Sequence, residues 1–295
     1  MMARFGEVLT AMVTPFRDDL SLDLDGAATL ARWLTEHGSE GLVVGGTTGE
    51  APTLSVAEHL DLARAVREAV TVPVIVGTGS NDTAHAIEMT KRAAELGADA
   101  ALVVGPYYNR PPQAGIEAHY RAVAAASPDL PILVYDVPGR TGRRIAHDVL
   151  VRLATEVPNI VGFKDATGDL VATARVVADT PSSFEVLSGD DALTLPMLSV
   201  GAVGVIGVAT HWAGPVFGEM IASYEKGDVA RARELHVRLI PSFEYSNSET
   251  VVFSMATKAM LRNLGLPVGE CRPPLGPAPA GTEERARKVY EAIRV

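Results

Sequence analysis

The stretch IVGFKDATGD, residues 160–169, is a run of mostly apolar residues that ends in a polar turn. Its first part does not alternate between apolar and polar residues, which is typical of a parallel strand covered on both faces. Seven other short apolar runs occur, most of them also continuous, and strands are therefore predicted at residues 8–14, 41–46, 72–79, 98–106, 130–138, 160–166, 184–190 and 203–210. Parallel strands need a crossover segment between neighbours, so helices are expected in the intervals.

Helical patterns occupy those intervals. Residues 55–70 begin with Ser55 and carry Glu58 three positions later, which predicts a capping box. Residues 82–99 contain Gly97 near their end, as expected for the residue just past a helix C-terminus. This alternation predicts an α/β fold, a (β/α)8 TIM barrel. A doubly wound open sheet is the alternative, and it is disfavoured because no G-x-G-x-x-G follows the first strand.

The strand signals stop after the first 225 residues. Three helical patterns follow, at residues 226–243, 248–265 and 281–295. A proline-rich loop, residues 271–281, separates the last two. We therefore predict a barrel over residues 1–225 and a C-terminal helical extension over residues 226–295.

Composition excludes several classes of partner. The net charge is −10 and no run of Lys and Arg forms a basic stripe, so nucleic acid is not expected as a partner. The single cysteine, Cys271, cannot form an intrachain disulfide and has no metal-ligand spacing around it, which favours the cytoplasm and predicts no metal site. Residues 192–210 are uncharged, but Pro196 and recurrent glycines favour a helix, a turn and a buried strand over a membrane span.

Lys164 lies inside the sixth predicted strand, although lysine is among the costliest side chains to bury unpaired. Strand alternation predicts that Ile160 and Gly162 share its face, with Gly162 leaving room beside it. Asp165 is predicted on the other face, where it is a poor partner for the amine. The four other lysines fall in helical patterns or at a helix boundary, where a solvated position suffices: Lys91, Lys226, Lys258 and Lys288.

Two interpretations of Lys164 remain open from the residues alone. It could belong to a buried structural ion pair. Alternatively, desolvation could keep its amine neutral, so that it attacks a carbonyl carbon as a Schiff-base nucleophile.

Polar residues gather after the predicted strands, where barrels of this type carry their active sites. Thr47 and Thr48, in GGTTGE, could cradle a small carboxylate together with backbone N–H groups, or could simply cap the turn. Tyr135 ends the fifth strand and could relay protons or be a core residue. Arg140, in PGRTG, could grip a second carboxylate or be a solvated surface residue.

Five motifs occur in order at predicted strand ends: GGTTGE, YYNRPPQ, YDVPGRTG, GFKDATGD and SGDD. With TAMVTPF near the start and MATKAMLRNLGL near the end, nearly the whole chain resembles the dihydrodipicolinate synthase and N-acetylneuraminate lyase family of Schiff-base aldolases. Within this family, YYN and PGRTG resemble the members that condense pyruvate with aspartate 4-semialdehyde to 4-hydroxy-tetrahydrodipicolinate, the first committed step of diaminopimelate and lysine biosynthesis. A sister lyase acting on a sugar acid, such as 2-keto-3-deoxygluconate or N-acetylneuraminate, is the alternative. A non-catalytic keto-acid binder is a more distant one.

The resemblance implies that Lys164 forms the imine with pyruvate. It implies a proton relay of Thr48, Tyr135 and Tyr108, the last reaching in from a neighbouring subunit. Substrate contacts are implied for Thr47, Thr48, Arg140, Gly189 and Ile206. No metal or organic cofactor is implied, because the protonated imine is itself the electron sink. A homotetramer built as a pair of tight dimers is also implied.

Regulated members of the family bind lysine at the tight-dimer interface, and the matching positions here are Ala51, Val56, His59, Asn81, His85 and Tyr107. Val56 stands where the pattern has a histidine, and His85 stands where it has a glutamate that pairs with the ligand's ammonium. Losing a charged partner costs more than about 1.5 kcal/mol, or roughly tenfold in affinity. Feedback by lysine is therefore expected to be weak or absent.

Overall fold

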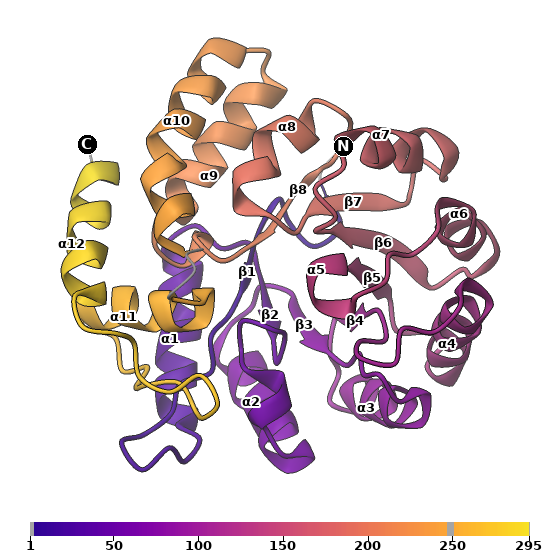
Figure 1. The fold of residues 1–295 in the computed structure, drawn as a ribbon, viewed down its shortest axis with the longest axis horizontal. Coiled ribbons are helices and arrows are strands. Elements are labelled where there is room, and N and C mark those ends of the chain that lie inside the picture. Colours follow the sequence, from indigo (N-terminus) through magenta and orange to yellow (C-terminus); the bar gives the residue numbers. More distant parts are fainter. Residues whose placement is uncertain (1–2, 247–250, 295) are drawn as a thin grey trace. The chain divides into compact units, whose positions relative to one another are not determined.

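The computed structural model describes residues 3–246 and 251–294. Eight parallel strands close into a barrel in chain order, which confirms the predicted (β/α)8 fold (Figure 1). The strands are β1 (Val8–Ala11), β2 (Gly41–Val44), β3 (Val74–Gly77), β4 (Ala100–Val104), β5 (Ile132–Asp136), β6 (Ile160–Asp165), β7 (Glu185–Ser188) and β8 (Gly204–Gly207). Each lies within its predicted run and is shorter, because the buried apolar residues continue past the paired ladder into the strand-end loops.

The helices follow the predicted alternation: α1 (Leu24–Glu36), α2 (Val56–Ala69), α3 (Thr83–Glu95), α4 (Gln113–Ala126), α5 (Pro138–Thr141), α6 (His147–Glu156), α7 (Leu170–Asp179), α8 (Thr194–Leu198), α9 (Thr210–Glu225), α10 (Val229–Ser246), α11 (Phe253–Asn263) and α12 (Thr282–Ile293). The capping box of α2 is present, with Ser55 and Glu58 bonded reciprocally. Gly97 follows α3 with a positive φ of 77°.

Two predicted helices extend past the described residues. The first three residues of the predicted segment 248–265 and the last residue of 281–295 lie outside them. Within the described part, α11 begins only at Phe253, because the two preceding valines are extended or irregular.

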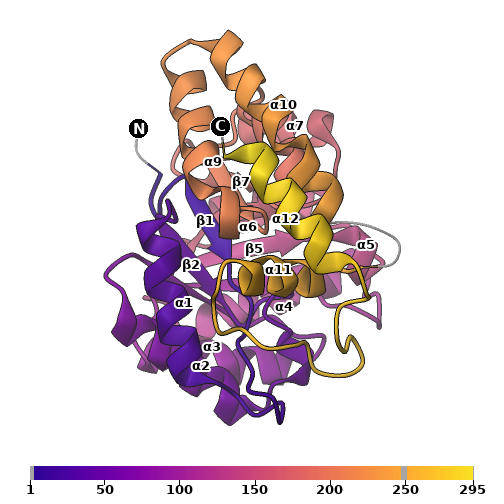
Figure 2. The same cartoon turned by 90° about the vertical axis from the view of Figure 1, so that its left-hand side faces the viewer.

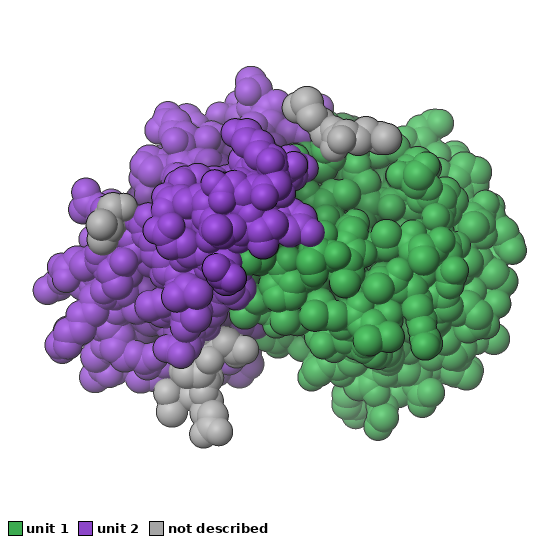
Figure 3. All heavy atoms as spheres, turned by 90° about the horizontal axis from the view of Figure 1, so that it is seen from above, with its two compact units in different colours: residues 1–7, 75–206 green, residues 8–74, 207–295 purple. Residues whose placement is uncertain are grey.

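The chain divides into two compact units (Figure 3). The first comprises residues 1–7 and 75–206, with β4 to β7 and α3 to α8. The second comprises residues 8–74 and 207–295, with β1, β2, α1, α2 and the C-terminal helices. The division of the chain into a barrel ending at residue 225 and an extension after it stays a prediction.

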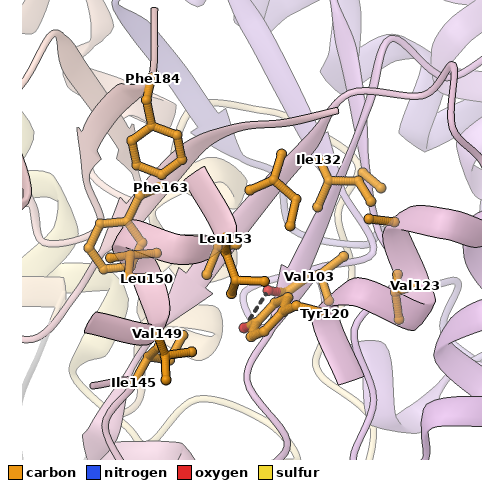
Figure 4. Close-up of a cluster of buried hydrophobic side chains, with 14 of the residues drawn as sticks. Val103, Tyr120, Val123, Ile132, Ile145, Val149, Leu150, Leu153, Phe163 and Phe184 are labelled. Atoms are coloured by element: carbon orange, nitrogen blue, oxygen red, sulfur yellow. Dashed lines mark hydrogen bonds between the residues drawn. The ribbon is translucent and has the colours of Figure 1, made fainter. Parts of the chain in front are cut away.

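In the first unit, a hydrophobic cluster fills the space between the strands and the helices that cover them (Figure 4). Phe163 of β6 packs in it with Leu150 and Leu153 of α6. The Tyr120 hydroxyl donates to the Val103 carbonyl at 3.2 Å, so the one polar atom of this side chain is satisfied. Because Phe163 faces the helices, its neighbour Lys164 faces the opposite side of the strand.

The prediction that Ile160 shares the face of Lys164 is wrong. Ile160 belongs to the same outer cluster as Phe163. The pairing of β5 with β6 is irregular here, since Ile132 pairs with Ile160 while the next residue, Leu133, pairs with Gly162. One extra residue in β6 reverses the alternation, as a β-bulge does.

Gly162 makes room for a different side chain from the one predicted. A Cβ at this position would lie 2.7 Å from Cδ2 of Leu133 and 2.8 Å from the carbonyl oxygen of Glu185. Gly162 therefore allows the side chain of Leu133 and the backbone of Glu185 to approach β6 closely. It does not provide the space beside Lys164.

In the second unit, the C-terminal helices pack on one another, with α10 beside both α9 and α12 (Figures 1 and 2). Trp212 of α9 donates its indole N–H to Ser242 of α10 at 3.0 Å. The Tyr245 hydroxyl of α10 donates to the Ala256 carbonyl of α11 at 2.8 Å. These buried bonds join α9 to α10 and α10 to α11.

No helix in the described ranges is long and apolar enough to cross a bilayer. The uncharged stretch 192–210 contains the short helix α8, a turn at Gly201 with φ 102°, and the buried strand β8. This is the predicted arrangement.

Candidate active site

Lys164 is a buried amine in the sixth strand. It is 6% exposed and is paired along the sheet with Tyr135 of β5 and Leu187 of β7. Its Nζ lies 4.5 Å from the centroid of the Tyr135 ring. Among the ion pairs of the described residues, none involves Lys164. The interpretation of Lys164 as half of a structural ion pair is therefore wrong.

Burial lowers the pKa of Lys164 from its usual 10.5 to about 8, against the opposing effect of the Asp191 charge. With that pKa, about a tenth of the amine is neutral at pH 7, roughly 300-fold more than for a free lysine. Only the neutral amine attacks a carbonyl carbon. Burial therefore increases the fraction of the Lys164 amine that is neutral near pH 7.

Gly189 lies against the stem of this lysine. A Cβ on Gly189 would be 3.1 Å from Cγ of Lys164 and 2.9 Å from Cβ of Ala166. The Gly189 N–H donates to the Asp165 carbonyl at 2.7 Å, which fixes the turn after β7 against β6. The absence of a side chain at this position leaves the lysine free of a close contact. Ile206, also named from the sequence, is buried in β8.

Asp165 lies on the other side of β6, as predicted. Its carboxylate accepts from the Thr173 hydroxyl at 2.6 Å and from the Thr167 N–H at 2.9 Å. It therefore stabilises the turn that leads into α7 and is directed away from the Lys164 amine.

Arg140 is exposed on the short helix α5, in the turn that follows β5. The carboxylate of Asp136, at the end of β5, accepts from the Ile145 N–H at 3.0 Å and so joins the two ends of the segment that contains α5. Burial raises the pKa of Asp136 to about 7, and the nearby Asp165 charge acts in the same direction. The turn is thus anchored from within the fold and carries the Arg140 guanidinium at the surface.

Tyr108 is 90% exposed and has a positive φ of 69°. A non-glycine residue in this region costs on the order of 1 kcal/mol or more and persists only where the surroundings hold it. The Asn109 side chain donates to the Asn81 carbonyl at 2.9 Å and fastens the loop. The loop therefore leaves the Tyr108 side chain exposed.

Thr47 and Thr48 lie together in the turn after β2, in the second unit. Thr48 is 4% exposed and Thr47 is half-buried. The turn begins at Gly45, which has φ 64° and no room for a Cβ because the His59 ring lies directly beneath it. His59, which the sequence suggested for a regulatory site, therefore supports this turn through its ring.

Lys258 is a second residue that the sequence placed wrongly. The predicted solvated position is contradicted, because its side chain is 0% exposed and its Nζ lies 2.7 Å from Oε1 of Glu50. Nζ also donates to the Glu270 carbonyl at 2.9 Å. The apolar residues around it in MATKAML are the signal that could have revealed its burial, since α11 is enclosed on most sides.

The two buried lysines therefore differ in chemistry. Burial lowers the pKa of Lys258 as well, but the charge of Glu50 opposes this, and the pair locks the ammonium in place. Lys164 has no such carboxylate within ion-pair distance in the described part of the chain. Of the two, Lys164 is therefore the candidate nucleophile.

The geometry can be set beside known proteins. The sequence model described as "Dihydrodipicolinate synthetase family" matches residues 4–293. A 4-hydroxy-tetrahydrodipicolinate synthase of Parasynechococcus marenigrum is 49% identical over 292 residues, covering 98% of this chain and 96% of the relative. One of Acidothermus cellulolyticus is 51% identical over 293 residues, covering 98% and 93%. A crystal structure of DHDPS from Cyanidioschyzon merolae with lysine bound has a TM-score of 0.95 at 44% identity, and covers 99% of each chain.

The burial of Lys164 without a carboxylate at ion-pair distance predicts that a methionine there stabilises the fold. One pKa unit corresponds to about 1.4 kcal/mol, so a pKa of about 8 in place of 10.5 predicts that Lys164→Met raises the unfolding free energy at pH 7 by roughly 3 kcal/mol. The folded-state pKa is the lower one, so the penalty is complete below pH 8 and disappears as pH rises through 10.5. Urea unfolding at both pH values measures it.

Lys288→Met is the matched control, because Lys288 is 71% exposed in a surface pair with Glu284 and should change stability little. A Lys164→Met variant that is less stable than the parent at pH 7, or equally stabilised at pH 7 and 10.5, contradicts the prediction.

Proposed function

The chain belongs to the dihydrodipicolinate synthetase family, and we propose that it condenses pyruvate with aspartate 4-semialdehyde to form 4-hydroxy-tetrahydrodipicolinate. The observation that carries the proposal is the buried amine of Lys164 beside the Tyr135 ring. This reaction is the first committed step of diaminopimelate and lysine biosynthesis. We place it in the cytoplasm.

The first half of the reaction makes an imine. The neutral amine of Lys164 attacks the ketone carbon of pyruvate, and the resulting carbinolamine loses water to give a protonated imine. Proton transfers to and from the oxygen accompany this step, and the Tyr135 phenol is proposed to relay them. The cationic nitrogen then withdraws electrons from the adjacent carbon, so a methyl proton leaves and an enamine forms.

The second half makes the carbon–carbon bond and the ring. The enamine carbon attacks the aldehyde carbon of the semialdehyde, whose oxygen takes up a proton. The amine of the semialdehyde then attacks the imine carbon, and the ring closes as Lys164 leaves as a free amine. In this scheme the protonated imine does the work of an electron sink, so we propose that no metal or organic cofactor takes part.

Other residues are proposed to bind and to move protons. Thr47 and Thr48 hold the carboxylate of pyruvate, which suits two hydroxyls in a buried, glycine-flanked turn. The exposed Arg140 binds the carboxylate of the semialdehyde. Gly189 and Ile206 line the pocket through their backbones. Thr48 and Tyr135 join Tyr108 in the proton relay.

Tyr108 connects the chemistry to assembly. Its phenol is 90% exposed on a loop held in an unfavourable backbone conformation, which suits a residue that enters the site of a second subunit. We therefore propose a homotetramer made of two tight dimers, in which each tight dimer completes the relay.

Trapping with borohydride tests the imine. Incubation with pyruvate and borohydride should reduce the imine and leave a pyruvyl adduct on Lys164, located by peptide mass spectrometry. The Lys164→Ala variant should give no adduct and lose at least about 1000-fold in activity, since the covalent route is removed. Lys288→Met should retain both. An adduct on any other lysine, or full activity in Lys164→Ala, refutes the proposal.

A panel of aldehydes tests the second substrate. Aspartate 4-semialdehyde should give the highest kcat/KM, well above that of sugar aldehydes. Arg140→Ala should raise KM for the semialdehyde by roughly tenfold or more and leave pyruvate trapping intact, because a charge-assisted carboxylate contact is lost. Faster reaction with a sugar aldehyde would instead identify a sister lyase.

Feedback by lysine is proposed to be weak, on account of Val56 and His85. Half-inhibition is expected only above about 1 mM lysine, since a missing charged partner costs roughly tenfold in affinity. His85→Glu restores the carboxylate and should strengthen inhibition, measured by initial rates at graded lysine. His85→Gln is the uncharged control. The remaining positions proposed for this site are Ala51, His59, Asn81 and Tyr107, and half-inhibition of the parent at sub-millimolar lysine argues against the proposal.

A further inference from the structure

We propose that the buried pair of Lys258 and Glu50 is a positioning device for the turn that carries Thr47 and Thr48. The inference rests on the proposed function, because it concerns the turn that binds the pyruvate carboxylate. Through Lys258, the C-terminal helical extension becomes part of the active-site machinery. The interactions that carry the inference all lie within the second unit.

The carboxylate of Glu50 is held at both oxygens. Oε1 lies 2.7 Å from Nζ of Lys258, with both side chains 0% exposed. Oε2 accepts from the Arg272 backbone N–H at 2.9 Å. Lys258 is fixed in turn by the Glu270 carbonyl at 2.9 Å. Glu50 is therefore clamped between α11 and the loop that follows it.

A second clamp involves the side chain of Arg272. Its guanidinium pairs with Glu58 at 2.5 Å and donates to the Thr53 carbonyl at 2.7 Å. The Arg272 guanidinium carbon and the Lys258 ammonium both lie over the Phe16 ring, at 4.3 Å and 4.2 Å from its centroid. The segment just after the turn is thus tied to the C-terminal part of the chain at several points.

The backbone of the turn needs this support. Glu50 is a non-glycine residue with φ 58°, in the left-handed region, and such a conformation persists only where the surroundings determine it. The Thr14 hydroxyl donates to the Gly49 carbonyl at 2.5 Å, and the His59 ring packs beneath Gly45. Both ends of the short Thr47–Thr48 segment are therefore fixed.

A buried ion pair is weak evidence for stability, because desolvation offsets its attraction. Two apolar side chains would fill the same space, but they would not hold a carboxylate against the Arg272 N–H group. The ion pair therefore fixes the orientation of Glu50 and of the turn before it. Substrate-binding groups have to be held within about 0.5 Å, and a misplacement of about 1 Å can cost on the order of 100-fold in rate.

The test uses Lys258→Met and Glu50→Gln in the full-length enzyme. Each should raise KM for pyruvate, and the pyruvate concentration that half-saturates borohydride trapping on Lys164, by roughly tenfold or more. KM for aspartate 4-semialdehyde should change by less than about twofold, because Arg140 lies on a different turn. Lys288→Met, the same substitution in an exposed pair, should leave both constants unchanged.

A purely structural role predicts another pattern. In that case the substitutions lower the thermal unfolding midpoint and the fraction of active enzyme. They leave the half-saturating pyruvate concentration of the folded enzyme unchanged. That result in Lys258→Met and Glu50→Gln overturns the inference. If the parent enzyme itself forms no adduct with pyruvate, the proposed function falls and this role falls with it.

Two further variants test the inference if Lys258→Met or Glu50→Gln alone does not fold. Glu50→Gln combined with Lys258→Met leaves no unpaired buried charge and should fold better than either single variant, yet still bind pyruvate weakly. Thr14→Val removes only the hydrogen bond to Gly49 and should raise the half-saturating pyruvate concentration several-fold. Wild-type pyruvate affinity in both variants also overturns the inference.

Discussion

The removal of one amine from water is the constraint on which the proposed chemistry of this protein depends. Lys164 lies in the sixth strand, is 6% exposed and has no ion-pair partner among the described residues. Its pKa falls to about 8 as a result, and imine formation becomes possible near neutral pH. The surrounding features serve this state: Asp165 is engaged on the far side of the strand, and Gly189 leaves the lysine stem uncrowded.

The same energetic problem has two different solutions in this chain. Lys258 is as deeply buried as Lys164, but its charge is matched by Glu50 at 2.7 Å. Burial lowers the pKa of both lysines, but only Lys258 is held by a carboxylate at ion-pair distance. In the proposed scheme Lys164 supplies the nucleophile and Lys258 holds the turn that carries Thr47 and Thr48, and the close carboxylate of Glu50 distinguishes the two lysines.

The pattern of apolar and polar residues predicted most of the fold, and the predictions that failed have identifiable causes. Continuous apolar runs located all eight strands, and Ser55 with Glu58 located the start of α2. Ile160 was misplaced because an irregularity in the pairing of β5 with β6 reverses the alternation. Lys258 was misplaced because a lysine in a helical pattern was assigned a solvated position, although the apolar residues around it indicate a helix covered on most sides. Its partner Glu50 is far away in the sequence and is brought to it only by the fold.

The order of apolar and polar residues was enough to predict the barrel, the eight strand positions and the candidate groups at the strand ends. All three depend on local periodicity and on the rule that parallel strands bring their C-terminal ends to one edge. Only the tertiary structure decided which buried lysine is matched by a carboxylate and which is not. That outcome depends on distances between side chains far apart in sequence, such as Glu50 and Lys258, and on how completely packing removes water from each.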